Sequence, residues 1–165
     1  MPIILKNKET LLFGDFEFKC VIGKSGTKKL KKEGDNSTPK GIFELQHIYY
    51  RKDRIQKPIS NLKTIIIKKN MGWCDDPKSK HYNKLIKITK KIKVGYEKLY
   101  RKDHKYDLLI VIKYNYKKVF KNKGSAIFLH LTKNFFCTKG CIALKKNDFI
   151  ILCKLIKRNT KIEIN

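Results

Sequence analysis

Apolar and polar residues alternate with a period of two along several short stretches of the chain. The clearest stretch runs from Phe16 to Ile22, where Phe16, Phe18 and Cys20 are separated by Glu17 and Lys19. Alternation of this kind is typical of a strand with one buried face. Apolar runs of similar length predict further strands at Pro2–Lys6, Gly41–Tyr50, Thr64–Lys68, Leu108–Tyr114, Ser125–Leu131 and Lys161–Ile164.

One helix is predicted near the C-terminus, where Asn147 or Asp148 can cap the first turn. The polar, glycine-containing stretch 23–40 is predicted to be a loop, and residues 73–83 a second loop ordered by aromatic side chains. Together these elements predict a mainly β fold in a single domain, residues 1–165, with one C-terminal helix and long loops. The apolar stripe of the helix comprises Phe149, Ile150, Leu152, Cys153 and Ile156.

The formal net charge of +26 would ordinarily indicate a polyanionic partner. All but four of the 40 basic residues are lysines, however, and they are spread along the chain among many isoleucines and asparagines. Proteins that read nucleic acids usually concentrate their charge and use arginine forks for phosphate and guanine. We therefore interpret the lysines as a compositional bias and expect no specific nucleic-acid partner.

Five cysteines leave at least one thiol unpaired, as a working thiol nucleophile requires. They form no Cys-x-x-Cys pair, whereas the ligands of a structural zinc site normally occur as two tight pairs. The nearest approximation would combine Cys137 and Cys141 with Cys74 and His81. We expect neither a metal nor a cofactor.

No segment approaches the ~20 apolar residues of a membrane span, so we expect no transmembrane segment. Lys6, Lys8 and Glu9 interrupt the N-terminal region, where a secretory signal would need an apolar core. Taken alone, the sequence predicts a cytoplasmic protein, which we expect to be a monomer.

The most informative region lies near the C-terminal end. An apolar run ends in His130, and Cys141 follows Gly140 after a loop-forming excursion. Acyl transfer by a thiol needs a thiolate, an imidazole within hydrogen-bond reach and backbone N–H groups aimed at the developing oxyanion. We expect a strand over Ile127–His130, with Cys141 returning beside it so that the thiol faces the ring. Each residue alone would also suit a protein core.

Two further expectations follow for this site. The oxyanion would be held by the backbone N–H of Cys141 together with that of Gly140 or Lys139. The positive charge of Lys139 and its surroundings should lower the thiol pKa from its ordinary value of about 8.5.

The same residues resemble a known family. Ser125–His130 followed by Thr138–Leu144 is similar to the catalytic signature of the L,D-transpeptidase (YkuD-type) family, in a branch with a short histidine-to-cysteine loop. The commoner motif has a histidine two residues before the cysteine and an arginine two residues after it, where this chain has Lys139 and Ala143. Similar segments occur upstream in the same order at Gly23–Gly26, Lys32–Asp35 with Thr38–Gly41, Tyr50–Arg54, Gly72–Pro77 and Tyr82–Asn83.

This resemblance implies an L,D-transpeptidase-like β-sandwich of mixed strands that acts on peptidoglycan stem peptides. It implies a periplasmic or cell-envelope location, unlike the sequence taken alone. Cys141 would attack the carbonyl of the diamino acid at the third stem position, His130 would carry the proton, and a terminal D-alanine would leave. Transfer to a second stem's amine would give a 3→3 cross-link, and transfer to water would give L,D-carboxypeptidase activity.

Arginines are candidates for gripping the stem carboxylates, because lysine performs bidentate recognition poorly. Arg51, Arg54 and Arg101 lie in the similar segments, although ordinary ion pairs with Asp53 or Asp103 would also account for them. The residues that could wall the site and bind amide or amine groups are Trp73, Asp75, Asp76, Asn83 and Ser125. The alternative is a self-bonded loop with Trp73 packed in the core.

Two other function classes stay open. One is a different cysteine acyl-enzyme, a peptidase or amidase, on the same scaffold, although papain-like and related cell-wall cysteine peptidases place the cysteine before the histidine. The other is a basic polyanion-binding module with an inactive site. Such a module would lose affinity steeply as salt rises and would be indifferent to thiol modification.

Overall fold

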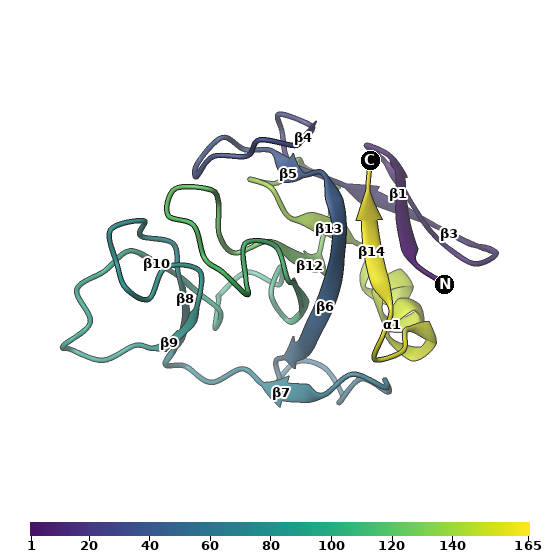
Figure 1. The fold of residues 1–165 in the computed structure, drawn as a ribbon. Helices are drawn as coiled ribbons and strands as arrows, with labels where there is room; N and C mark the ends of the chain where they lie inside the picture. Colours follow the sequence, from purple (N-terminus) through teal and green to yellow (C-terminus); the bar gives the residue numbers. More distant parts are fainter.

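The computed structural model describes all residues from Met1 to Asn165. Nine strands form one mixed sheet in the order β11-β12-β13-β3-β2-β1-β14-β6-β7, and an additional pairing of β11 with β6 closes this sheet on itself. Figure 1 shows β6 and β14 side by side across the middle of the molecule. The strands are β1 (Ile3–Asn7), β2 (Thr10–Phe13), β3 (Phe16–Val21), β6 (Gly41–Tyr50), β7 (Thr64–Ile66), β11 (Leu108–Ile112), β12 (Phe128–Leu131), β13 (Ile142–Leu144) and β14 (Lys161–Ile164).

The predicted mainly β fold of mixed strands is confirmed, and the expected sandwich takes the form of this closed sheet. Three pairs are parallel: β1 with β14, β12 with β13, and β6 with β7. In β3 the alternation has the predicted effect, because Phe18 and Cys20 are buried while Glu17 and Lys19 are exposed. The predicted strand from Ser125 begins only at Phe128.

A smaller sheet stands beside the closed one, in a region where the sequence predicted a loop over residues 73–83 and no strand. It has the order β10-β8-β9 and consists of β8 (Met71–Cys74), β9 (Leu85–Lys87) and β10 (Tyr96–Lys98). Figure 1 places these strands together, away from the helix. The predicted loop 23–40 likewise contains a short parallel pair, β4 (Thr27–Lys28) and β5 (Thr38–Pro39). Runs of two to four residues are too short to show a clear period in the sequence.

The single helix, α1 (Lys146–Leu155), confirms the C-terminal prediction but not its cap. The N-cap is Lys145, without a side-chain capping bond, so the expected cap at Asn147 or Asp148 is wrong. Asp148 lies in the first turn, where its negative charge complements the helix dipole. No helical segment is long and apolar enough to cross a bilayer.

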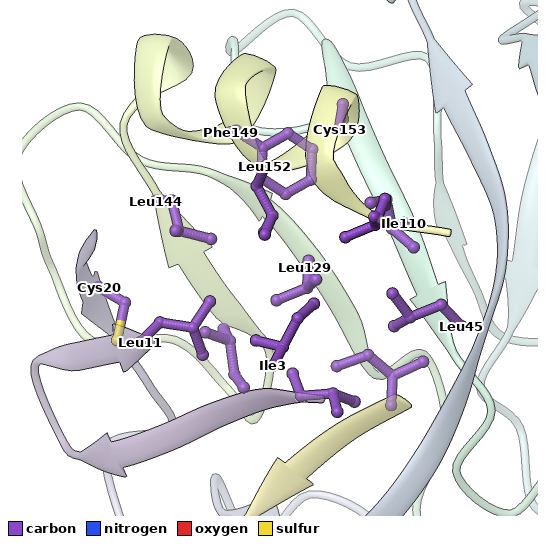
Figure 2. Packing of buried hydrophobic residues seen from close by; sticks show 14 of the residues in the cluster. Ile3, Leu11, Cys20, Leu45, Ile110, Leu129, Leu144, Phe149, Leu152 and Cys153 are labelled. Carbon is purple, nitrogen blue, oxygen red and sulfur yellow. The ribbon is translucent and has the colours of Figure 1, made fainter. Parts of the chain in front are cut away.

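Two apolar clusters lie on the two faces of the closed sheet. The larger one packs α1 against the strands, and Figure 2 shows Phe149 and Leu152 pointing from the helix toward Leu129 and Leu144. The smaller cluster contains Phe128, Trp73 and Cys141 and lies on the face toward β8 and β10. Burying both faces of β12 fixes this strand between the clusters, which gives the residues at its ends defined positions.

Candidate active site

His130 belongs to β12, and Cys141 directly precedes β13, the strand that pairs with β12 in parallel. β12 and β13 pair in a register that sets His130 opposite Ala143, and Cys141 lies two residues before Ala143 on the same face. Both residues line one cavity of about 920 Å³. The expected return of Cys141 beside the histidine strand is therefore found.

The Cys141 thiol is buried and hydrogen-bonded on two sides. Its Sγ lies 3.2 Å from the carbonyl oxygen of Ala126, and the backbone N–H of Phe128 donates to Sγ at 3.4 Å. Burial, followed by the negative charge of Glu97, raises the pKa of this thiol to about 12. The expectation that Lys139 would lower the thiol pKa is wrong: Lys139 is exposed, and burial dominates.

His130 is equally buried, and burial lowers its pKa to about 4. Nδ1 lies 2.9 Å from the carbonyl oxygen of Leu131. Because a carbonyl only accepts, the proton of the neutral ring must sit on Nδ1, which leaves Nε2 as a proton acceptor. The site therefore pairs a neutral thiol with a neutral imidazole.

Gly140 shapes the turn before Cys141. Its φ is +144°, and a Cβ built there would lie 2.7 Å from the backbone oxygen of Ser37, so only glycine fits. The N–H of Gly140 donates to Thr138 Oγ1 at 3.1 Å, and that hydroxyl donates to the carbonyl oxygen of Cys141 at 2.6 Å. The N–H groups of Lys139 and Cys141 have no acceptor within the protein. This favours Lys139 over Gly140 as the second expected oxyanion donor.

Asn83 joins three segments near Cys141. Its Oδ1 accepts from the Trp73 indole N–H at 2.9 Å and from the Ala126 N–H at 3.0 Å. Its Nδ2 donates to the two carbonyls of residues 114–115 at 3.0 and 2.7 Å. The amide is thus fully used, and Trp73 packs edge to face on Phe128 at 5.3 Å. For these two candidates the structure supports the self-bonded alternative, not contact with substrate.

Ser125 links the 23–40 segment to the residues that precede β12. Its hydroxyl donates to Glu33 Oε2 at 2.7 Å, and Tyr82 donates to the same oxygen. Nearby, the buried Lys31 ammonium binds Asp35 Oδ1 at 2.7 Å. Ser125, Glu33 and Lys31 all line the cavity, so this segment forms one of its walls.

The family model for the L,D-transpeptidase catalytic domain (YkuD) matches residues 4–164, nearly the whole chain. The chain belongs to the L,D-transpeptidase (YkuD) family. No curated protein matches it significantly. Among solved structures it is similar to Bd1075 of Bdellovibrio bacteriovorus, with a TM-score of 0.49 and 18% identity over 99% of this chain. The match covers 47% of the Bd1075 chain, so the present chain spans about half its length.

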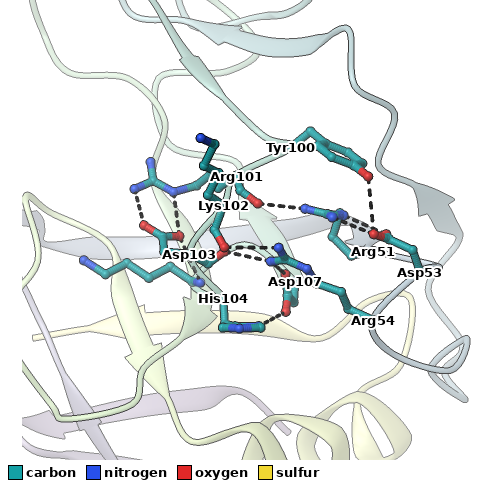
Figure 3. Close-up of polar contacts among 10 residues, drawn as sticks. Arg51, Asp53, Arg54, Tyr100, Arg101, Lys102, Asp103, His104 and Asp107 are labelled. Carbon is teal, nitrogen blue, oxygen red and sulfur yellow. Dashed lines mark hydrogen bonds and ion pairs between the residues drawn. The ribbon is translucent and has the colours of Figure 1, made fainter.

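In this L,D-transpeptidase domain, three arginines expected to grip substrate are engaged with neighbouring residues (Figure 3). Arg51 Nε and Nη2 donate to the two carboxylate oxygens of Asp53 at 2.8 and 2.6 Å. Its Nη1 donates to the backbone carbonyl of Arg101 at 2.8 Å. Arg51 is buried and lies outside the cavity. For Arg51 the structure supports the ion pair with Asp53, the alternative that the sequence left open, because this pair and the Arg101 carbonyl occupy all three nitrogens of the guanidinium.

Arg101 repeats the same local geometry, with Nε and Nη2 bound to Asp103 at 2.9 and 2.6 Å. Arg54 reaches across to Asp107 Oδ1 at 2.9 Å and to the carbonyls of residues 102–103. Both arginines line the cavity, although their main partners lie within the protein. The tetrapeptide Tyr-Arg-Lys-Asp, which occurs twice in the sequence, thus forms two equivalent arginine forks that stabilise the 100–107 loop.

Only one of the two aspartates predicted to wall the site lines the cavity. Asp75 lines the cavity, and burial together with Glu97 raises its pKa. Asp76 lies outside it and accepts from the Lys78 N–H at 2.9 Å. The sequence analysis missed Glu97 and Tyr106, which both line the cavity, because neither lies in a segment that resembles the family motif.

Proposed function

We propose that this domain is a cysteine acyl-enzyme that acts on peptidoglycan stem peptides. The observation that carries the proposal is the common cavity lined by His130, which lies in β12, and by Cys141, which directly precedes the paired parallel strand β13. Family membership supports the stem peptide as substrate. We extend the proposal to a periplasmic or cell-envelope location on the same ground.

In the first half-reaction Cys141 Sγ attacks the carbonyl carbon of the third stem residue, and the thiol proton passes to His130 Nε2. The carbonyl oxygen, now negative, accepts from the N–H groups of Cys141 and Lys139. When the C–N bond breaks, His130 returns the proton to the departing D-alanine nitrogen. A thioester on Cys141 remains.

In the second half-reaction an amine of another stem, or water, attacks the thioester carbonyl. His130 accepts a proton from the attacking group, and the thiol is regenerated when it takes that proton back. The amine gives a 3→3 cross-link and water gives a shortened stem. The neutral resting pair suits this cycle, since the imidazole can accept a proton as soon as the substrate carbonyl is in place.

Incubation of the protein with a disaccharide tetrapeptide, followed by chromatography and mass spectrometry of the products, tests the proposal. We expect free D-alanine together with a cross-linked dimer, a tripeptide or both, and none of these with the Cys141→Ala variant. Cleavage at a different amide would favour the alternative peptidase or amidase. Tight, salt-sensitive binding to sacculi without turnover would favour a binding module.

A further inference from the structure

Tyr106 is a buried tyrosine that contacts the catalytic histidine directly. Its ring lies edge to face with the His130 imidazole, at a centroid distance of 5.3 Å and an interplanar angle of 69°. It makes a second edge contact with Phe128 at 5.7 Å and 82°. Since Phe128 and His130 are alternate residues of β12, Tyr106 covers the face of that strand on which the histidine lies.

The position of Tyr106 is itself fixed from two sides. Its hydroxyl donates to Glu97 Oε2 at 2.6 Å, and Glu97 belongs to β10 of the smaller sheet. The guanidinium of Arg101 lies over the tyrosine ring, 4.9 Å from its centroid. Figure 3 shows that Arg101 belongs to the arginine and aspartate network of the loop that leads to Tyr106. The ring is therefore supported by both the smaller sheet and this loop.

His130 has little other support. Its hydrogen bond, from Nδ1 to the carbonyl of Leu131, reaches only the next residue, and no carboxylate or amide side chain binds the ring. A single bond of this kind does not by itself fix the tilt of the imidazole plane about the bond axis. In many nucleophile and base pairs a third side chain sets this orientation by a hydrogen bond. Here an aromatic contact occupies the place of that third group.

We propose that Tyr106 is a positioning residue for His130, holding the imidazole plane so that Nε2 faces the Cys141 thiol. The inference rests on the proposed function in that it takes His130 as the proton carrier. It goes beyond the paired cysteine and histidine by giving the orienting role to an aromatic side chain anchored on Glu97. Edge-to-face aromatic pairs select one ring orientation over others because the positive ring edge prefers the negative ring face.

The test compares Tyr106→Leu and Tyr106→Phe with Tyr50→Leu. Tyr50 is a matched control because it is as buried as Tyr106, at 5% against 6% exposed, but packs in the other cluster. For each folded variant we would record the heteronuclear spectrum of the His130 side chain, the rate at which iodoacetamide alkylates Cys141, and kcat and KM on the tetrapeptide.

Tyr106→Leu should broaden or split the His130 side-chain resonances and lower kcat about 100-fold, with KM changed less than about threefold, because misplacing a reacting group costs about that much. Tyr106→Phe keeps the ring and loses one hydrogen bond, so kcat should fall about three- to tenfold. Tyr50→Leu should leave the His130 spectrum unchanged. Unchanged His130 resonances in a folded Tyr106→Leu variant would overturn the proposal.

If Tyr106→Leu does not fold, Tyr106→Phe decides the question, and a wild-type kcat with wild-type His130 resonances would contradict the positioning role. The spectrum and the alkylation rate need no substrate. A wild-type protein that is inactive on muropeptides would therefore contradict the proposed function, and the His130 resonances of the variants would still test the positioning role.

Discussion

The Sγ atom of Cys141 lies 3.2 Å from the carbonyl oxygen of Ala126, a residue whose backbone adopts the left-handed region at a φ of +51°. Few non-glycine residues adopt this conformation, and it costs of order 1–3 kcal/mol. In this protein the left-handed conformation of Ala126 ends the segment before β12 and turns the Ala126 carbonyl group toward the Cys141 thiol. The contact suits a protonated thiol, since a carbonyl oxygen cannot donate to a thiolate.

A first prediction concerns thiol reactivity in the free protein. Burial raises the pKa of Cys141 to about 12, whereas Cys137 is exposed in the same loop region. At pH 7 iodoacetamide should therefore alkylate Cys137 at least about tenfold faster than Cys141, because the thiolate is the reactive species. Peptide mapping of a time course by mass spectrometry measures both rates. Faster labelling of Cys141 would indicate a thiolate in the resting state.

A second prediction concerns stability against pH. The folded-state pKa of His130 is about 4 against an ordinary value of 6.5, so between these values the unfolded chain binds a proton that the folded protein does not. The associated stability is complete above pH 6.5 and is lost as pH falls toward 4. The loss should amount to roughly 3 kcal/mol.

Urea unfolding of the wild type and of His130→Gln between pH 7 and pH 4 measures this difference. The variant should show a smaller loss of unfolding free energy across that window. His47→Gln provides a comparison in the same direction, since burial and two nearby lysines also lower the pKa of His47, so this variant too should show a smaller loss. Equal slopes for the wild type and His130→Gln would contradict a buried neutral His130.

A third prediction concerns the glycine before the nucleophile. Gly140→Ala would place a Cβ 2.7 Å from the Ser37 oxygen at a φ of +144°, so it should reduce stability by about 1–3 kcal/mol and turnover by at least about tenfold. Gly26 also has a positive φ, +72°, but it lies outside the cavity and a Cβ there would meet only the flexible end of Lys8 at 3.6 Å, so it provides the matched control. Gly26→Ala should cost about 1 kcal/mol and leave turnover within about twofold. Thermal unfolding and muropeptide kinetics distinguish the two variants.

A fourth prediction separates diffuse charge from local recognition. Lys28, Lys29 and Lys32 are exposed, whereas the intervening Lys31 is buried and bound to Asp35. Changing the three exposed lysines to glutamine should leave kcat and KM on a short soluble muropeptide within a few-fold, because local contacts hold the reacting groups. Binding to sacculi should weaken as screened attraction is lost. A large rise in KM on the short substrate would show that diffuse charge governs recognition.

Arg101→Lys is the companion variant, since it keeps the charge and removes the planar fork. Two of the fork's nitrogens bind Asp103, so a substrate carboxylate could use only the remaining one. If Arg101 binds substrate through that nitrogen, KM should rise about three- to tenfold with little change in kcat. An unchanged KM would restrict Arg101 to supporting the loop and Tyr106.

The sequence predicted the strands and the helix wherever a period could be read over five or more residues, as in β3 and α1. It led to Cys141 and His130 because glycine, cysteine and histidine carry their chemistry in their residue types, and the structure places both residues at one cavity. It did not predict β8 to β10, which are three or four residues long and depend on packing against β12 for their order. The direction of the pKa shift of Cys141 also could not be predicted from the neighbouring residues, since burial raises this pKa more than the nearby lysine lowers it.

The positions of the Glu97, Tyr106 and Lys31 side chains also could not be predicted from the sequence. Each lines the cavity, but each is brought there by tertiary contacts with residues remote in sequence from the reactive pair. For the arginines the sequence left two roles open, binding of substrate carboxylates and ion pairs with Asp53 or Asp103, and the structure contains the ion pairs. An ion pair between residues two positions apart orders little extra chain, whereas an arginine side chain held in place without a partner loses rotamer freedom with no compensating bond.

The central claim is that Cys141 becomes covalently acylated by a stem peptide. Intact-mass spectrometry after rapid mixing with tetrapeptide muropeptide, followed by peptide mapping, tests it most directly. The account predicts an adduct equal to the substrate less D-alanine, located on Cys141, present in Cys137→Ser and absent from Cys141→Ser. Product release with no adduct on Cys141 and with full turnover by Cys141→Ser would contradict it.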